Sequence, residues 1–303
     1  MEKKGQVTIF AIIGIIIVII FVLALMLQDK GTKPSAHRDD NDLNKVKVYG
    51  ESCLKDATEM AVYKLGLEGG HINPRGDSFY DISGIPHYDF KGESLPIFLD
   101  ENGVRSIPDK QDVEENLEKI IEVNFFDCFD LTTFKSMGME IEAPLTNYEN
   151  GYQEYEDVNA DVTVFDDRID VKLNYPIEIS NLDKVKKVDE FRHSSSIRLG
   201  RILEGLNSLL PKIKEKWDQH TIRDNNFYLE DFNCDQIDPK KYITIYALDN
   251  DNLNKRVVRV VDYYNFYKTD HKSGFIFQFA VEDTKEEPIR FRGIVCQGTP
   301  LNI

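Results

Sequence analysis

The sequence lacks the short motifs that mark the common catalytic and metal sites. It contains no H-E-x-x-H zinc motif, no G-x-S-x-G nucleophile elbow and no glycine-rich phosphate loop ending in Lys-Ser or Lys-Thr. No two cysteines have C-x-x-C spacing, which excludes a compact zinc knuckle. The sequence also has no N-x-S/T glycosylation sequon. We therefore predict no catalytic residue, no cofactor and no bound metal.

Basic residues are scarce relative to acidic ones. The chain has 37 Lys and Arg against 53 Asp and Glu, which gives a formal net charge of −16. Such a chain is repelled by nucleic acid and by an anionic membrane face, so we expect no nucleic-acid partner. Its 41% apolar residues are sufficient for a packed core, which excludes a wholly disordered chain.

A single uncharged run, residues 7–27 (VTIFAIIGIIIVIIFVLALML), stands out near the start of the chain. A helix of about 20 apolar residues spans a bilayer core, whereas the apolar part of a signal peptide has only about 7–15. Lys3 and Lys4 precede the run, and positive residues favour the cytoplasmic side. We predict a transmembrane helix over residues 6–28, with a cytoplasmic N-terminus and an extracytoplasmic ectodomain at the cell membrane.

The junction before the apolar run carries a second signal. The K-K-G-Q motif at residues 3–6, followed at once by the apolar helix, resembles the archaeal class III signal of type IV prepilins. The resemblance covers about the first 27 residues. It implies cleavage between Gly5 and Gln6 by a prepilin peptidase, and association with other surface or pilus-system proteins. Phe10 stands where many pilin-type helices carry glutamate, and Pro34 interrupts the helix beyond the run. The alternative is an uncleaved signal anchor.

All four cysteines follow the apolar run: Cys53, Cys128, Cys234 and Cys296. An even number of cysteines in an exported domain predicts disulfides. Three pairings are possible. We favour Cys53–Cys128 and Cys234–Cys296, because the first two lie on neighbouring predicted helices and the last two flank the C-terminal strands. The alternative is four buried free thiols.

Apolar residues at three- and four-residue steps predict three amphipathic helices, over residues 43–67, 109–135 and 183–219. Gly69 and Gly70 should end the first helix, Asp109 should cap the second, and Pro211 should kink the third. Residues 71–108 contain several prolines and predict a long coil with a short strand pair. Long loops of this kind often form a binding surface.

Alternating apolar and polar residues predict strands in the second half of the chain. The clearest is a hairpin of residues 158–165 and 169–179, and further strands are expected at 242–248, 256–264, 274–281 and 289–296. The predicted fold class is α+β, an N-terminal transmembrane helix followed by amphipathic helices packed on an antiparallel sheet. The predicted parts are the leader 1–5, the transmembrane helix 6–28, a polar linker 29–42, a helical part with the coil insertion 43–138, and an α+β part 139–303.

Aromatic residues crowd the segment 263–279, and most such residues are core or cross-strand pairs. Any exposed members would form a candidate partner surface, which we assign to Tyr263, Tyr264, Phe266 and Tyr267.

Three classes of function follow from the sequence. The leading one is a single-pass membrane-anchored surface protein, type IV pilin-like in its leader, with a structural, adhesive or complex-forming role. The second is a tethered ectodomain that binds a ligand or polysaccharide through residues 71–108 and the aromatic strands. The third is an extracytoplasmic enzyme. His193 lies beside Ser194, but neighbouring residues of the predicted third helix would point apart, so they do not indicate a nucleophile and its base.

Overall fold

The computed structural model describes residues 37–72, 85–105, 107–144, 146–149, 152–155, 158–181, 184–219, 226–228, 243–248, 255–264, 274–282, 290–292 and 294–296. The chain divides into two compact units, residues 1–45 and 46–303. Of the first unit, only the start of helix α2 (His37–Leu67) is described. The predicted leader and transmembrane helix lie outside these ranges. Within them, no helix has both the length and the apolar character that crossing a membrane requires.

The fold is α+β, as predicted. Besides α2, its helices are α3 (Lys110–Cys128), α4 (Thr132–Ser136) and α5 (Leu199–Gln219). A smaller sheet consists of β4 (Glu140–Glu142), β7 (Asn159–Val164), β8 (Ile169–Asn181) and β9 (Lys184–Ser195). A larger sheet consists of β1 (His87–Phe90), β2 (Glu93–Asp100), β3 (Gly103–Val104), β11 (Ile243–Leu248), β12 (Lys255–Asp262), β13 (Phe275–Glu282) and β15 (Ile294–Cys296). Two strand pairs stand apart, β5 (Thr146–Glu149) with β6 (Tyr152–Tyr155) and β10 (Asn226–Tyr228) with β14 (Arg290–Arg292).

The predicted hairpin is confirmed as the antiparallel pair β7–β8. Its face assignment is also confirmed, because every second side chain of β8 is buried: Ile169, Val171, Leu173, Tyr175, Ile177 and Ile179. The alternate residues remain partly exposed. One face of the smaller sheet therefore contacts the core and the other contacts solvent.

The prediction of a third helix is wrong for its first half. Residues 184–195 form strand β9, which pairs antiparallel with β8, and the helix begins only at Leu199. The pairing register shifts between Asn174 and Ile177 of β8, so the buried residues Val188 and Phe191 of β9 are three positions apart. That spacing is the helical one, which explains the wrong prediction. From Leu199 onward the apolar stripe is buried as predicted, and α5 continues through Pro211.

The larger sheet combines strands from distant parts of the chain. Strands β11, β12 and β13 form the predicted antiparallel meander, but β2 pairs parallel to β13, so the sheet is mixed. The side chains of β2 are almost all buried. The strand pair expected in the segment 71–108 is present as β1–β2, but β2 is a core strand, where the sequence predicts a binding surface. The sheet also draws strands from both sides of residue 138, the predicted boundary between the helical and α+β parts.

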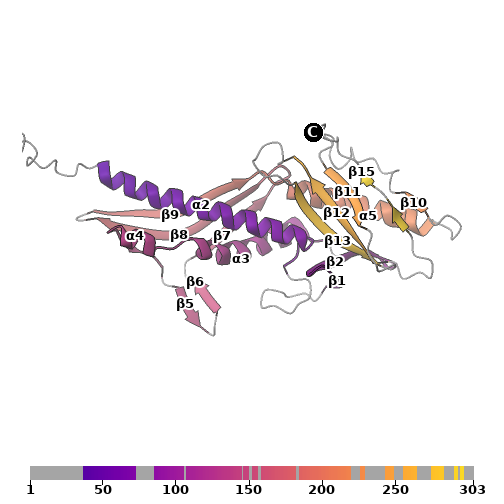
Figure 1. Cartoon of the computed structure of the whole chain (residues 1–303), viewed down its shortest axis with the longest axis horizontal. Helices are drawn as coiled ribbons and strands as arrows, with labels where there is room; N and C mark the ends of the chain where they lie inside the picture. The colour runs from indigo at the N-terminus through magenta and orange to yellow at the C-terminus, as the bar shows by residue number, and fades with distance from the viewer. Residues whose placement is uncertain are drawn as a thin grey trace, which may run out of the picture. The chain divides into compact units, whose positions relative to one another are not determined.

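Helix α2 packs against both sheets (Figure 1). It begins at His37, inside the predicted linker, and ends at Leu67 before Gly69 and Gly70, whose positive φ angles terminate it as predicted. A Cβ atom on Gly50 would overlap the ring of Phe191 in β9. A Cβ atom on Gly66 would lie 2.5 Å from the carbonyl oxygen of Ile276 in β13. At both positions only glycine leaves room for the neighbouring sheet.

Helix α3 is fixed at both ends. Asp109 caps it as predicted, in a capping box with Asp112, and the helix ends at Cys128, before the predicted end at residue 135. A disulfide joins Cys128 to Cys53 of α2, with a Cα–Cα distance of 5.5 Å. This is one of the two pairs favoured from the sequence. In the second pair, Cys296 ends strand β15, whereas Cys234 lies outside the described residues.

We predict that Gly50→Ala destabilises the protein by about 1–3 kcal/mol, because the added methyl group must displace the Phe191 ring. At an exposed helical position the same exchange would stabilise by about 1 kcal/mol. Chemical denaturation monitored by circular dichroism measures the difference. Ser52→Ala, at an exposed position of the same helix, is the matched control and should change stability by less than about 0.5 kcal/mol. A Gly50→Ala variant more stable than wild type would contradict this packing.

Candidate functional site

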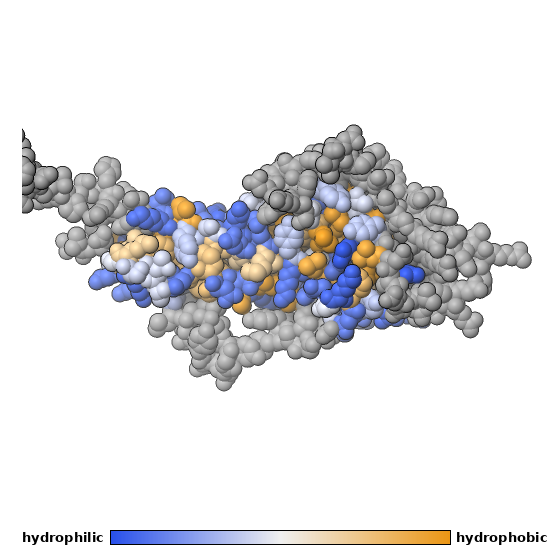
Figure 2. Space-filling model, in the orientation of Figure 1, coloured by the Kyte–Doolittle hydropathy of each residue, from blue (hydrophilic) through white to orange (hydrophobic). Residues whose placement is uncertain are grey.

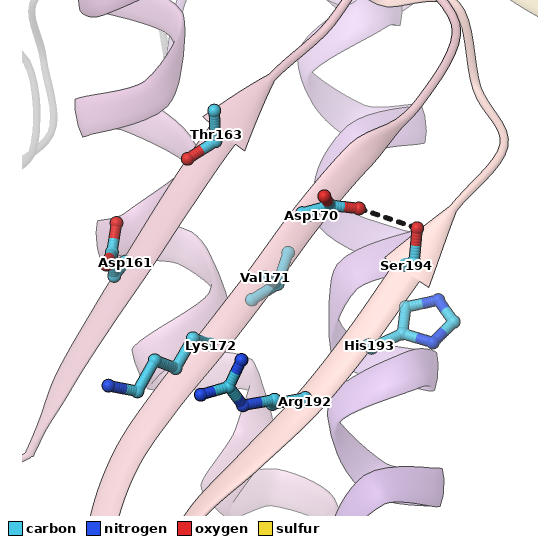
Figure 3. A pocket seen from close by; sticks show the side chains of 8 residues that line it. All are labelled: Asp161, Thr163, Asp170, Val171, Lys172, Arg192, His193 and Ser194. Carbon is cyan, nitrogen blue, oxygen red and sulfur yellow. Dashed lines mark hydrogen bonds between the residues drawn. The ribbon is translucent and has the colours of Figure 1, made fainter.

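A pocket of about 400 Å³ lies on the smaller sheet, over strands β7, β8 and β9 (Figure 3). Its lining residues are Asp161, Thr163, Asp170, Val171, Lys172, Arg192, His193 and Ser194. Six of these are polar or charged side chains on the solvent-exposed face, whereas Val171 and His193 belong to the inward-facing set of β8 and β9. The pocket is thus an open, polar hollow on the wet face of the sheet.

Strand register sets the arrangement of the polar lining. Asp161 of β7 lies opposite Lys172 of β8, which in turn lies opposite Arg192 of β9. One step along the hairpin, Asp170 of β8 has Thr163 on one side and Ser194 on the other. Residues directly opposite in an antiparallel pair point to the same face. The pocket therefore has one row with two cations and a carboxylate, and a second row with two hydroxyl groups and a carboxylate.

The charged groups of the pocket are held by defined contacts. The Ser194 hydroxyl donates to Asp170 Oδ1 at 2.6 Å, and this hydrogen bond, together with Arg168, holds the pKa of Asp170 below its ordinary value. Arg192 Nε donates to Glu190 Oε1 at 2.6 Å, and Lys172 Nζ lies 3.0 Å from the other carboxylate oxygen. These two donors lower the pKa of Glu190. All these carboxylates are therefore ionised at neutral pH.

His193 does not contact the hydroxyl of Ser194. The two residues lie on strand β9, where successive side chains point to opposite faces. Burial lowers the pKa of His193, and its Nε2 atom has no hydrogen-bond partner. The charged groups that influence the ring are Glu59, Lys55 and Asp56 of α2. His193 is thus a neutral residue beneath the sheet, and the geometry offers Ser194 no general base in this residue.

The predicted partner surface of aromatic residues is only partly visible. Phe266 and Tyr267 lie outside the described residues, and Tyr263 and Tyr264 are half-buried. Tyr264 stacks on the guanidinium of Arg198, with 4.5 Å from Cζ to the ring centroid. The neighbouring aromatic residues of β13, namely Phe275, Phe277 and Phe279, are buried in the core. Tyr264 is therefore engaged inside the fold. The predicted cleavage site at Gly5 and Gln6 also lies outside the described residues.

A buried ion pair lies beneath Tyr264. Arg198, directly before α5, donates from Nε and Nη2 to the carboxylate of Asp262 at the end of β12, at 2.9 and 2.5 Å. Both side chains are at most 5% exposed, and the backbone N–H of Tyr264 donates to the same carboxylate at 2.9 Å. Such a pair tolerates burial only when its hydrogen bonds are complete. It connects the segment between β9 and α5 to strand β12 of the larger sheet.

A row of glutamates from α3 lies along the edge of β7. The backbone N–H groups of Val164, Val162 and Ala160 donate to Glu114, Glu118 and Glu122, respectively, at 2.7, 3.1 and 2.8 Å. Four helical residues rise about 6 Å, close to the roughly 7 Å that two strand residues span, so the two spacings match. The carboxylates thereby accept the hydrogen bonds that a neighbouring strand would accept.

The glutamate row was not predicted from the sequence, although the spacing of the glutamates is visible there. The glutamates recur every four residues beside the buried stripe of α3, and such a like-charge column is unfavourable on an isolated helix. Burial raises the pKa of Glu118 and Glu122, and repulsion from neighbouring carboxylates adds to the shift. Among the described residues, no group of His, Cys, Asp or Glu is arranged to hold a metal ion.

We predict opposite outcomes for two substitutions in the glutamate row. Glu122→Gln keeps an acceptor for the buried N–H of Ala160, whereas Glu122→Leu removes it and should cost about 1–3 kcal/mol of unfolding free energy. The folded-state pKa of Glu122 is raised above 4.5. The contribution of Glu122 to the free energy of unfolding is therefore complete below pH 4.5 and is lost as pH rises through the raised pKa. Glu122→Gln should therefore match or exceed wild-type stability at pH 7 and lose that advantage below pH 4.5. Urea unfolding at several pH values measures both effects, and a Leu variant as stable as wild type would exclude the role of the row.

We predict that breaking the buried ion pair is strongly destabilising. Arg198→Met leaves the Asp262 carboxylate buried and unpaired, which should cost about 3–5 kcal/mol. Combining it with Asp262→Asn, which retains an acceptor for the Tyr264 N–H, should cost less than the sum of the two single effects. The control is Lys110→Met, because the Lys110–Asp166 pair is exposed and should contribute at most about 1 kcal/mol. Additive losses in the double-mutant cycle would show that the pair is not coupled.

Comparison with protein-family models, with curated proteins and with solved structures found no match for this chain. Its function is therefore inferred from its own residues and their geometry.

Proposed function

We propose that this protein is a single-pass membrane-anchored protein whose folded body lies outside the cytoplasm, in a structural, adhesive or complex-forming role at the cell surface. The observation that carries the proposal is the Cys53–Cys128 disulfide in a chain that also contains the uncharged run of residues 7–27. The run has the length of a membrane span, and the disulfide suits the oxidising compartment that such a span would place the body in.

The disulfide has the features of a structural bond. It joins α2 to α3 across 75 residues of sequence, and Cys53 is fully buried. In the chain-entropy treatment, closing a loop of this length stabilises the fold by about 4 kcal/mol. Cytosolic thiols are kept reduced, so a stabilising contribution of this size supports folding outside the cytoplasm.

The net charge and the surface residues support a water-soluble domain on a membrane tether. The net charge of −16 keeps such bodies apart in solution. On the face shown in Figure 2, hydrophilic residues separate the apolar ones along α2. Exposed apolar residues of α2, such as Val48 and Met60, are single residues of this kind. The K-K-G-Q junction at residues 3–6 supports entry by the type IV prepilin route, with Gly5–Gln6 as the cleaved bond and a prepilin peptidase and other pilus-system proteins as partners.

A second candidate function is a tethered ligand-binding ectodomain, and the pocket on strands β7–β9 is the observation that favours it. The sequence places such a surface at residues 71–108. In the structure, β2 of that segment is buried in the larger sheet, so the pocket is the better location.

We predict that the protein extracted from membranes is shortened at its N-terminus and disulfide-linked, which intact mass measurement tests. The non-reduced mass should lack residues 1–5, and peptide mapping after alkylation should recover Cys53 and Cys128 as one linked species. Gly5→Leu should block the loss of the leader, whereas the control Gly14→Leu, within the apolar run, should leave it unchanged. An intact N-terminus on a membrane-bound, disulfide-linked chain would indicate an uncleaved signal anchor. Recovery of Cys53 and Cys128 as free thiols, or of the protein in the soluble fraction, would contradict the proposed location.

A further inference from the structure

We propose that the pocket on strands β7–β9 binds an acidic sugar, whose carboxylate is held by Lys172 and Arg192. The sugar hydroxyls would contact Thr163 and Ser194 in the neighbouring row, and Asp161, which lies opposite Lys172. The inference concerns the outer face of the smaller sheet alone, and it holds whether or not the chain is anchored in a membrane.

The cationic end of the pocket has unused hydrogen-bond donors. Lys172 and Arg192 are direct cross-strand neighbours, and both contact the single carboxylate of Glu190. Asp161, opposite Lys172, adds a carboxylate to the same row, and Glu190 is the carboxylate that both cations contact. The ammonium group has three donors and the guanidinium has five, so hydrogen-bonding capacity is left for a second carboxylate. Figure 3 shows both side chains on the same side of the sheet.

The other end of the pocket suits hydroxyl groups. The Ser194 hydroxyl donates its hydrogen bond to Asp170, so its oxygen is left as an acceptor, and Thr163 can both donate and accept. Asp161 adds a carboxylate opposite Lys172. Sugar hydroxyls donate and accept at once, and they match a lining that mixes carboxylate and hydroxyl oxygens. An anion without hydroxyl groups would leave this end of the pocket unpaired.

The same charges argue against other ligand classes. A polyanion would meet Asp161 and Asp170 in the pocket and a chain of net charge −16 around it. A neutral sugar would leave the remaining donors of Lys172 and Arg192 without a carboxylate to bind. The volume of about 400 Å³ lies within the range of small-molecule sites, which is enough for one or two sugar units. The lining contains no aromatic ring on which a sugar could stack, so the expected affinity is weak.

Saturation-transfer NMR on the full-length protein in detergent micelles tests the proposal, with sodium glucuronate as the probe. Glucose, which has the hydroxyls without the charge, and acetate, which has the charge without the hydroxyls, should each bind at least about ten-fold more weakly. The double variant Lys172→Gln/Arg192→Gln should weaken glucuronate binding by at least about ten-fold, or about 1.4 kcal/mol. The matched control is Lys187→Gln. Lys187 lies on strand β9 with Arg192, pairs with Glu178 and does not line the pocket.

Thermal unfolding of each variant keeps the result interpretable, because these side chains are on the exposed face and their loss should leave the midpoint close to wild type. No saturable glucuronate binding to the wild-type protein would overturn the proposal. Equal binding of glucose or of acetate, or unchanged binding by the double variant, would also overturn it. The location proposed above is tested separately by mass and disulfide mapping, so either proposal can fail without the other.

Discussion

The close approach of helix α2 to two sheets is the constraint on which the rest of the fold depends. Gly50 brings the helix against Phe191 of the smaller sheet, and Gly66 brings it against β13 of the larger one. A larger side chain at either position would separate the helix from its sheet. The residues between the two glycines are largely buried on the same side, so one helix supplies core residues to both sheets.

A disulfide and a set of hydrogen bonds then hold together the elements that the apolar packing brings into contact. The Cys53–Cys128 disulfide holds α3 to α2, and the glutamates of α3 accept the edge hydrogen bonds of β7. The β7–β8 turn in turn meets the start of α5, where a Cβ atom on Gly200 would lie 2.6 Å from the carbonyl oxygen of Phe165. The buried Arg198–Asp262 ion pair is held by its own hydrogen bonds and by the N–H of Tyr264. The outer face of the smaller sheet is left free of this packing, and it carries the pocket.

Local pattern allowed much of this fold to be predicted from the sequence, and the failures have physical causes. The β7–β8 hairpin was predictable because one face is wet, so polar and apolar residues alternate strictly along β8. Strand β9 was mistaken for helix because a register shift spaces Val188 and Phe191 by three residues. The place of β2 in the larger sheet could not be predicted, because its parallel pairing with β13 joins segments far apart in the chain. The pocket depends on the register of three strands, one of them β9, so the sequence prediction could not assemble it.

Because α2 contacts both sheets, we expect the two sheets of residues 46–303 to unfold as a single cooperative unit. Native-state hydrogen exchange under increasing denaturant tests it directly, because it reports the opening free energy of individual amides. The amides of β8 and of β13 should reach one common opening free energy, together with those of α2 between Cys53 and Gly66. Separate opening free energies for the two sheets, with the α2 amides following only one of them, would contradict the claim.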